Sequence, residues 1–176
     1  MHKHGSIMIK IYDDFLNQDE LIKVSNALVK RPWWFIVDQT DTNQNFYSKR
    51  TLGAPKNNPN DFDSCDYFFI NKLNSKLNIK LDLRYIGIVI NCFKYGDTPS
   101  PHVDNGVGGP TFLFFTNPIW KWWWGSGVQI GNKFVRAKPG RLIIFDGSKH
   151  HIAKPPNVLY KGPGRFSYAI QYQTPI

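Results

Sequence analysis

Two segments in the first half of the chain carry apolar residues at helical spacing. In Asp19–Val29 these residues form one stripe, and Asn17 with Glu20 three positions later resembles a capping box, which predicts a helix that begins here. Asp63–Leu77 shows the same one-sided pattern and predicts a second helix. The intervening residues 31–61 are rich in Pro, Asn, Thr and Asp, which predicts an irregular connection.

The pattern changes after Leu83. Short runs rich in β-branched and aromatic residues follow one another, separated by Gly, Pro and Asn, and each predicts a strand. The runs are Tyr85–Phe93, Thr111–Thr116, Val128–Val135, Arg141–Phe145, His151–Lys154 and Arg165–Gln173. Six or more short strands at this spacing predict a sandwich, barrel or jelly roll. We therefore expect a mainly β (α+β) fold, in which a helical and irregular N-terminal layer packs on a C-terminal β core.

Length and composition indicate one folded domain. The chain has 176 residues, 41% of them hydrophobic and 20% charged, which excludes intrinsic disorder as its main state. We assign residues 8–176 to this domain, with residues 8–83 as the N-terminal layer and 84–176 as the β core. Residues 1–7, which include MHKHGS, are interpreted as a tag or a disordered tail, and their histidines are assigned to no site.

The sequence also bears on location. The longest apolar runs are far shorter than the ~18 residues of a membrane span, and no signal-peptide segment opens the chain. Cys65 and Cys92 do not make a disulfide framework. We therefore expect no membrane partner and a cytoplasmic location, in the host cell if the source is viral.

Positive charge is concentrated in the second half of the chain. The net charge is +9; residues 1–88 hold 12 basic and 10 acidic side chains, whereas residues 89–176 hold 10 and 3. A basic C-terminal half indicates either an anionic ligand or nucleic acid as a partner, or simply a solvated lysine-rich face. The absence of an Arg-rich run or a nucleic-acid motif favours the solvated face.

The candidate chemistry lies in the motif PHVDN. On extended backbone His102 and Asp104 project to the same face and can share one metal ion. A further histidine from His150 or His151 would complete a two-histidine, one-carboxylate triad, which is typical of non-haem Fe(II) oxygenases. Arg165 opens the last apolar run, and a buried guanidinium there would suit a carboxylate ligand.

Together these segments resemble the Fe(II)/2-oxoglutarate-dependent dioxygenases, and within them the prolyl-4-hydroxylase-like branch. The resemblance covers about residues 85–173. Its motifs follow the family's order: NCFKYGDTPSPHVDN, GGPTFLFFTNPIW, WWWGSGVQI, KPGRLIIFDGSKHH and RFSYAIQY. The resemblance implies a double-stranded β-helix, which is a jelly-roll core, braced by the N-terminal helices.

The resemblance also implies roles for individual residues. His102, Asp104 and His151 would bind Fe(II), because the family's spacing from the strand phenylalanine Phe145 favours His151 over His150. Arg165 would bind the distal carboxylate of 2-oxoglutarate, with Ser167 as a second donor. Where the family often has a tyrosine this chain has Phe93, which donates no hydrogen bond. Further co-substrate contacts would then come from Tyr85, Asn91 or Tyr95.

The implied activity is hydroxylation of an unactivated C–H bond, with O2 as oxidant and release of succinate and CO2. Ascorbate is an expected stimulant. The closest branch favours a prolyl or other residue in a peptide or protein. The first alternative is oxidative demethylation or hydroxylation of nucleic acid, which is disfavoured because Gln171 stands where such enzymes usually carry a second arginine. The others are a free amino acid or small molecule as substrate, and a non-catalytic jelly-roll binding module.

Two further segments are candidates for substrate contact. The aromatic cluster that includes Trp120 and Trp124, with Trp122 and Trp123 between, either walls a substrate groove or packs in the core and at a strand edge. Residues 38–61 form either a mobile substrate lid or a plain connection.

Overall fold

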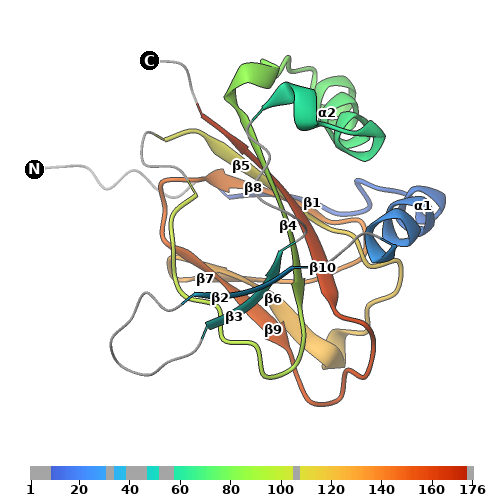
Figure 1. Ribbon diagram of the computed structural model, residues 1–176, viewed down its shortest axis with the longest axis vertical. Helices are drawn as coiled ribbons and strands as arrows, with labels where there is room; N and C mark the ends of the chain where they lie inside the picture. The colour runs from blue at the N-terminus through green and yellow to red at the C-terminus, as the bar shows by residue number, and fades with distance from the viewer. Residues whose placement is uncertain (1–8, 31–33, 39–46, 52–57, 105–107, 174–176) are drawn as a thin grey trace, which may run out of the picture.

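The strands form two antiparallel sheets. A computed structural model describes residues 9–30, 34–38, 47–51, 58–104 and 108–173 (Figure 1). A seven-stranded sheet has the order β1-β8-β5-β10-β4-β3-β2, and a three-stranded sheet has the order β7-β6-β9. The strands are β1 Lys10–Tyr12, β2 Trp34–Asp38, β3 Tyr47–Thr51, β4 Ile86–Phe93, β5 Pro110–Phe115, β6 Gly125–Ile130, β7 Lys133–Arg136, β8 Leu142–Asp146, β9 His151–Pro156 and β10 Arg165–Tyr172.

The helices cover one side of the larger sheet, as Figure 1 shows. Both begin at the residues that the sequence predicts. Asn17 caps α1, Gln18–Val29, in a capping box with Glu20, and Asp63 caps α2, Ser64–Leu77, in a box with Asp66. Three short 3-10 helices lie between the strands: η1 Pro59–Asp61, η2 Leu83–Tyr85 and η3 Trp122–Trp124.

Two apolar clusters hold these layers together. One joins the buried faces of the helices to the larger sheet, as where Phe69 of α2 stacks on Tyr168 of β10 at 3.9 Å between ring centroids. The other lies between the two sheets and includes Val128 and Ile130 of the smaller sheet and Phe115 and Phe145 of the larger one. Because β10 contributes to both clusters, its side chains alternate between the helix layer and the space between the sheets. This is the predicted jelly roll with bracing helices.

Several sequence-based boundaries were wrong. Residues 31–61 are not wholly irregular, because β2 and β3 pair with each other and β3 pairs with β4. The run Val128–Val135 is not one strand but the hairpin of β6 and β7. Strand β1 was not predicted. Most of the segment 38–61 lies outside the described residues, so the substrate lid stays a prediction.

Within the described residues, no helix combines the length and apolar character that crossing a membrane requires. Cys65 and Cys92 are not joined by a disulfide.

Candidate metal centre and its pocket

A backbone bridge brings the two histidines of the candidate triad together. The amide of His102 donates to the carbonyl of His151 at 2.9 Å, and the amide of His151 donates back to His102 at 2.9 Å. The amide of Asp104 donates to the carbonyl of Gly147 at 2.8 Å. The segment that follows β4 is thus fixed against the start of β9, which places two residues about fifty positions apart side by side.

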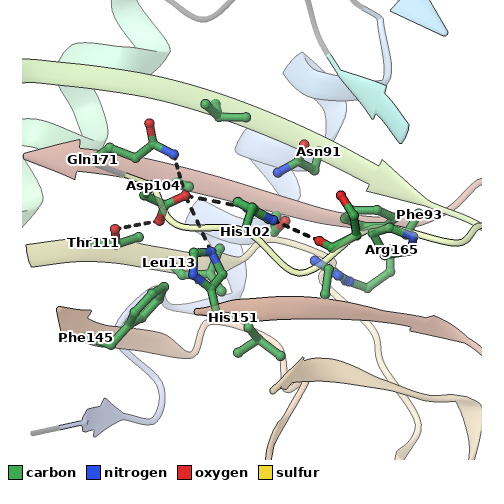
Figure 2. Close-up of a pocket in the computed structure, with 17 residues that line it drawn as sticks. Asn91, Phe93, His102, Asp104, Thr111, Leu113, Phe145, His151, Arg165 and Gln171 are labelled. Carbon is green, nitrogen blue, oxygen red and sulfur yellow. Dashed lines mark hydrogen bonds and ion pairs between the residues drawn. The ribbon is translucent and has the colours of Figure 1, made fainter. Parts of the chain in front are cut away.

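The three side chains form a compact donor group (Figure 2). Asp104 Oδ1 lies 3.4 Å from His151 Nε2 and 3.7 Å from His102 Nε2, and the candidate ligand atoms all lie within 4.8 Å of one another. His151 and Asp104 are buried, whereas the His102 side chain is 43% exposed. His150 is exposed and lies outside this group. The structure therefore brings together His102, Asp104 and His151, the three residues predicted from the sequence. The His102 side of this group is open to solvent.

Backbone carbonyls fix both imidazole rings. The Nδ1 atom of His102 lies 3.0 Å from the carbonyl oxygen of Ser100, and the Nδ1 atom of His151 lies 3.0 Å from that of Lys149. A carbonyl only accepts, so each Nδ1 carries a proton, and Nε2 is the nitrogen of each ring that a metal ion would bind. The two Nε2 atoms face Asp104, as metal-binding histidines require.

Two neutral donors hold the carboxylate of Asp104. Thr111 Oγ1 donates to Oδ2 and Gln171 Nε2 donates to Oδ1, each at 2.6 Å. Burial acts to raise the pKa of Asp104, but hydrogen bonding and charge from His151, with help from Thr111, outweigh it and lower the pKa. The carboxylate therefore stays anionic at neutral pH, as a metal ligand must.

A pocket of about 290 Å³ runs from this group toward Arg165. Its floor includes alternate residues of β10, namely Arg165, Ser167, Ala169 and Gln171. Because strand side chains alternate, residues at even spacing share one face. The same strand therefore carries Gln171 at the metal end of the pocket and Arg165 at the far end.

Arg165 is a buried cation with spare hydrogen-bonding capacity. Its side chain is 2% exposed, and its guanidinium carbon lies 4.8 Å from the ring centroid of Phe93 and 5.3 Å from that of Phe115. Nε donates to Ser126 Oγ at 3.1 Å, whereas Nη2 has no hydrogen-bond partner among the described residues. Burial lowers the pKa of Arg165 to about 10, so it is still protonated at neutral pH. An unpaired buried guanidinium at the end of a pocket indicates an anionic ligand.

Asn91 and Ser167 lie beside each other in the same pocket. They are paired in the register of β4 and β10, and both line the pocket. Oδ1 of Asn91 is buried and has no hydrogen-bond partner among the described residues. These two predicted contact residues therefore offer polar groups next to Arg165.

Other predicted contact residues lie elsewhere. Tyr85 lies in η2 with its ring against Tyr172, and Tyr95 is 63% exposed; neither is among the described residues that line the pocket. Trp120 and Trp124 pack on Tyr160 and do not line the pocket either. The pocket therefore gives no support to the expectation that Tyr85 and Tyr95 contact the co-substrate, which stays a prediction. Trp120 and Trp124 therefore agree with the alternative of packing at a strand edge, whereas Trp122 and Trp123 are exposed.

Sequence reasoning missed three residues that support the site: Thr111, Ser126 and Gln171. Ser126 Oγ donates to the carbonyl of Lys154 at 2.6 Å, which leaves its lone pairs for Arg165 Nε. The only available signal was the even spacing of Gln171 from Arg165 and Ser167 along one strand. Thr111 and Ser126 reach the site from other strands, and no local pattern marks them.

Comparisons with known proteins add solved structures of the same fold. No protein-family model and no curated protein sequence matches the chain. A prolyl-4-hydroxylase from Pseudomonas putida aligns with a TM-score of 0.65 at 13% identity, over 96% of this chain and 94% of that one. An oxidoreductase of the 2OG-Fe(II) oxygenase family from Burkholderia pseudomallei aligns with a TM-score of 0.63 at 10% identity, over 94% and 84%.

A third structure, a viral collagen prolyl hydroxylase from Paramecium Bursaria Chlorella virus-1, aligns with a TM-score of 0.51 at 14% identity, over 92% of this chain and 88% of that one. At these identities the likeness shows the fold. It confirms the predicted jelly-roll fold over nearly the whole chain, a fold shared with structures described as prolyl hydroxylases and a 2OG-Fe(II) oxygenase.

Proposed function

We propose that this chain is an Fe(II)- and 2-oxoglutarate-dependent oxygenase that hydroxylates a C–H bond of its substrate. The observation that carries the proposal is the position of two complementary groups in one pocket. Two imidazole nitrogens and a carboxylate lie at one end, and the unpaired guanidinium of Arg165 lies at the other. The first set suits a facial-triad metal with open positions, and the second suits a dicarboxylate that extends away from that metal.

The donor set fits the cofactors. His102, Asp104 and His151 would hold Fe(II), and Arg165 with Ser167 and Asn91 would hold 2-oxoglutarate. When bound, Fe(II) supplies the activation of O2 that couples decarboxylation of 2-oxoglutarate, to succinate and CO2, to hydroxylation of a C–H bond. We include ascorbate as a stimulant that keeps the metal reduced.

The chain's own residues bind, orient and exclude water. The carbonyls of Ser100 and Lys149 accept from Nδ1 and orient both imidazole rings with Nε2 toward the metal position, and Thr111 and Gln171 fix the rotation of the Asp104 carboxylate. Phe93 and Phe115 shield Arg165 from water, which strengthens its attraction for a carboxylate. The exposed flank at His102 gives a substrate access to the centre.

The favoured substrate is a prolyl or other residue in a peptide or protein. Two observations support this class: the open flank beside His102 accommodates a large substrate, and two of the structures reported above are described as prolyl hydroxylases. Nucleic acid and small molecules are the alternatives, and a non-catalytic binding module is the alternative of another class. We also propose a cytoplasmic location, which agrees with cysteines that are not joined by a disulfide.

Anaerobic titration of the metal-free protein with Fe(II) and then 2-oxoglutarate tests the proposal without a known substrate. We expect a weak visible charge-transfer band that needs both additions, and its loss in Asp104→Ala. Peptides with and without proline are then supplied with O2, and mass spectrometry records a gain of one oxygen atom. Folded protein that gives no band would disprove the oxygenase assignment, whereas a band without peptide oxidation would redirect the search to the other substrates.

A further inference from the structure

Two neighbouring loops expose several large apolar side chains. We call this cluster the Trp122 patch. Its members are Ile119, Trp122, Trp123, Val158 and Leu159, with exposed fractions of 65%, 72%, 45%, 49% and 60%. Soluble proteins rarely leave such side chains together in water, so a patch of this kind indicates an interaction site.

Hydrogen bonds join the two loops into one platform. The side-chain amide of Asn157 donates to the carbonyl of Trp123 at 2.7 Å, and its backbone amide donates to the carbonyl of Trp124 at 2.9 Å. Tyr160 packs against both Trp120 and Trp124, with ring centroids 4.7 and 5.0 Å away. The backbone that carries the exposed side chains is therefore ordered, which lowers the entropy lost when the two loops bind a partner.

The Trp122 patch is separate from the candidate active site. None of its five residues is among the described residues that line the pocket, and the proposed chemistry makes no use of them. A role in positioning iron or 2-oxoglutarate therefore does not explain their exposure.

The charges around the patch are mostly positive. Lys121 and Lys161 are exposed and belong to the same two loops, and Lys121 Nζ lies 5.2 Å from the ring centroid of Trp123. The two loops, residues 117–124 and 157–164, contain these two lysines and no acidic residue. The start of α1 adjoins these loops, because the side-chain amide of Gln18 donates to the carbonyl of Pro118. The next residue of α1 is the acidic Asp19. One carboxylate thus borders a surface that is otherwise basic.

The composition of the patch distinguishes between anionic partners. Single-stranded nucleic acid binds by stacking its bases on aromatic faces, and Ile119, Val158 and Leu159 offer none. Indole rings, aliphatic side chains and lysines together are what a bilayer interface accepts, since indoles lie at the headgroup level and lysines attract anionic lipids.

We propose that the Trp122 patch docks the protein on the surface of an anionic lipid bilayer. Trp122 and Leu159, two of its most exposed members, enter the interfacial layer, and Lys121 and Lys161 contact the headgroups. The chain does not span the bilayer in this arrangement. The proposal is independent of the oxygenase chemistry.

Flotation with lipid vesicles tests this docking. The full chain is mixed with vesicles of phosphatidylcholine alone, or with about one third phosphatidylserine, and tryptophan fluorescence is recorded in parallel. We expect binding to the anionic vesicles with a blue shift of the emission, at least about tenfold weaker binding to neutral vesicles, and weakening by salt.

Variants on the exposed surface make the test specific. Trp122→Ser with Leu159→Ser, and separately Lys121→Glu with Lys161→Glu, should each weaken binding by about tenfold or more. Val29→Ser, on α1 and 49% exposed, is the matched control and should bind as the parent does. Equal binding by all variants, or no binding to anionic vesicles, would overturn the proposal. A parent that does not bind vesicles, but binds oligonucleotides or self-associates through the patch, would also overturn it. Fluorescence anisotropy and light scattering measure these two activities, which the patch variants would then lose.

Discussion

The hydroxyl group of Tyr168 donates a 2.6 Å hydrogen bond to Asp66 Oδ1, and both side chains are fully buried. The other carboxylate oxygen of Asp66 accepts from the backbone amide of Asp63, which begins α2. Tyr168 lies on β10, the strand whose opposite face carries Arg165 and Gln171. One carboxylate therefore joins the first turn of a bracing helix to the strand that forms the floor of the pocket.

Removal of this hydroxyl should destabilise the fold and leave the site chemistry intact. Tyr168→Phe leaves a carboxylate oxygen of Asp66 without this donor in the core, so we expect the free energy of unfolding to fall by about 1–3 kcal/mol. Urea denaturation measures the change. Tyr67→Phe on the same helix, where the ring is 38% exposed, is the control and should change little. A parental free energy of unfolding in Tyr168→Phe would show that the bond contributes nothing net.

The same hydroxyl predicts a loss of stability at alkaline pH. Burial, with the nearby Asp66 carboxylate, raises the pKa of Tyr168 well above 10. A group whose pKa is raised by folding contributes stability that is complete below its unfolded pKa, about 10, and is lost as the pH rises from there through the folded pKa. The stability difference between the parent and Tyr168→Phe should therefore be constant below about pH 9 and shrink above pH 10. Denaturation curves across this range measure it, and a difference that stays constant would contradict the shift.

Features of the fold that depend on residues close together in the sequence could be predicted from the sequence. The starts of both helices follow from side chains three positions apart, Asn17 with Glu20 and Asp63 with Asp66. Strand β1 could not be predicted in the same way, because its three residues are held by pairing with β8, 130 or more positions later. The hairpin of β6 and β7 was taken as one run because its turn, at Gly131, interrupts the apolar pattern only briefly.

The same distinction applies to the site. His102 and Asp104 lie two residues apart, so their common face could be read from one motif. The contacts of Thr111 and Gln171 with Asp104 join three separate segments, and only the folded sheet creates them. Tyr85 and Tyr95 were candidates by residue type, but their positions on η2 and in an exposed turn remove them from the pocket.

The two adjacent histidines make a matched pair for testing the metal ligands. His151 is buried beside Asp104, whereas His150 is exposed and contributes its backbone carbonyl to a bond with Gly131. We expect His151→Ala to lose specific binding of a divalent probe such as Co(II), and His150→Ala to keep it. Visible absorption of the bound Co(II) is the measurement. The reverse result would assign the third ligand to His150.

Arg165→Met should separate ligand binding from stability. The unpaired buried guanidinium is unfavourable in the absence of a ligand, as its lowered pKa of about 10 indicates. A long apolar side chain between Phe93 and Phe115 should raise the free energy of unfolding by about 1–3 kcal/mol. The substitution should also weaken 2-oxoglutarate binding by 100-fold or more, which corresponds to about 3 kcal/mol or more of binding free energy. Binding of Co(II) should remain.

Thermal denaturation and 2-oxoglutarate titration of the Co(II)-loaded protein check both effects. In the parent the co-substrate should raise the melting temperature, and in Arg165→Met it should not. Unchanged 2-oxoglutarate affinity would show that the guanidinium does not bind the co-substrate.

Gln171 should act on the metal through Asp104 alone. Its amide donates to Oδ1, the oxygen that faces both histidines, so it fixes the rotation of the carboxylate without being a ligand itself. Gln171→Leu keeps the volume and removes the donor. Of the two donors, only Thr111 then remains, and it binds Oδ2. The metal-facing oxygen Oδ1 has lost its amide donor, so the carboxylate is less firmly oriented. Partners of this kind typically contribute about 10–100-fold to metal affinity, and we expect a loss of that size for Co(II).

The control for this prediction lies at the end of the same strand. Gln173 is exposed and follows β10, so Gln173→Leu makes the same chemical change at a distance from the carboxylate. Gln171→Asn shortens the side chain and should restore little, because the amide no longer reaches Oδ1 at 2.6 Å. Co(II) affinity is measured together with the free energy of unfolding, since a merely structural role would lower stability and leave affinity unchanged. Parental Co(II) affinity in Gln171→Leu would show that Thr111 and the two histidines orient Asp104 without it.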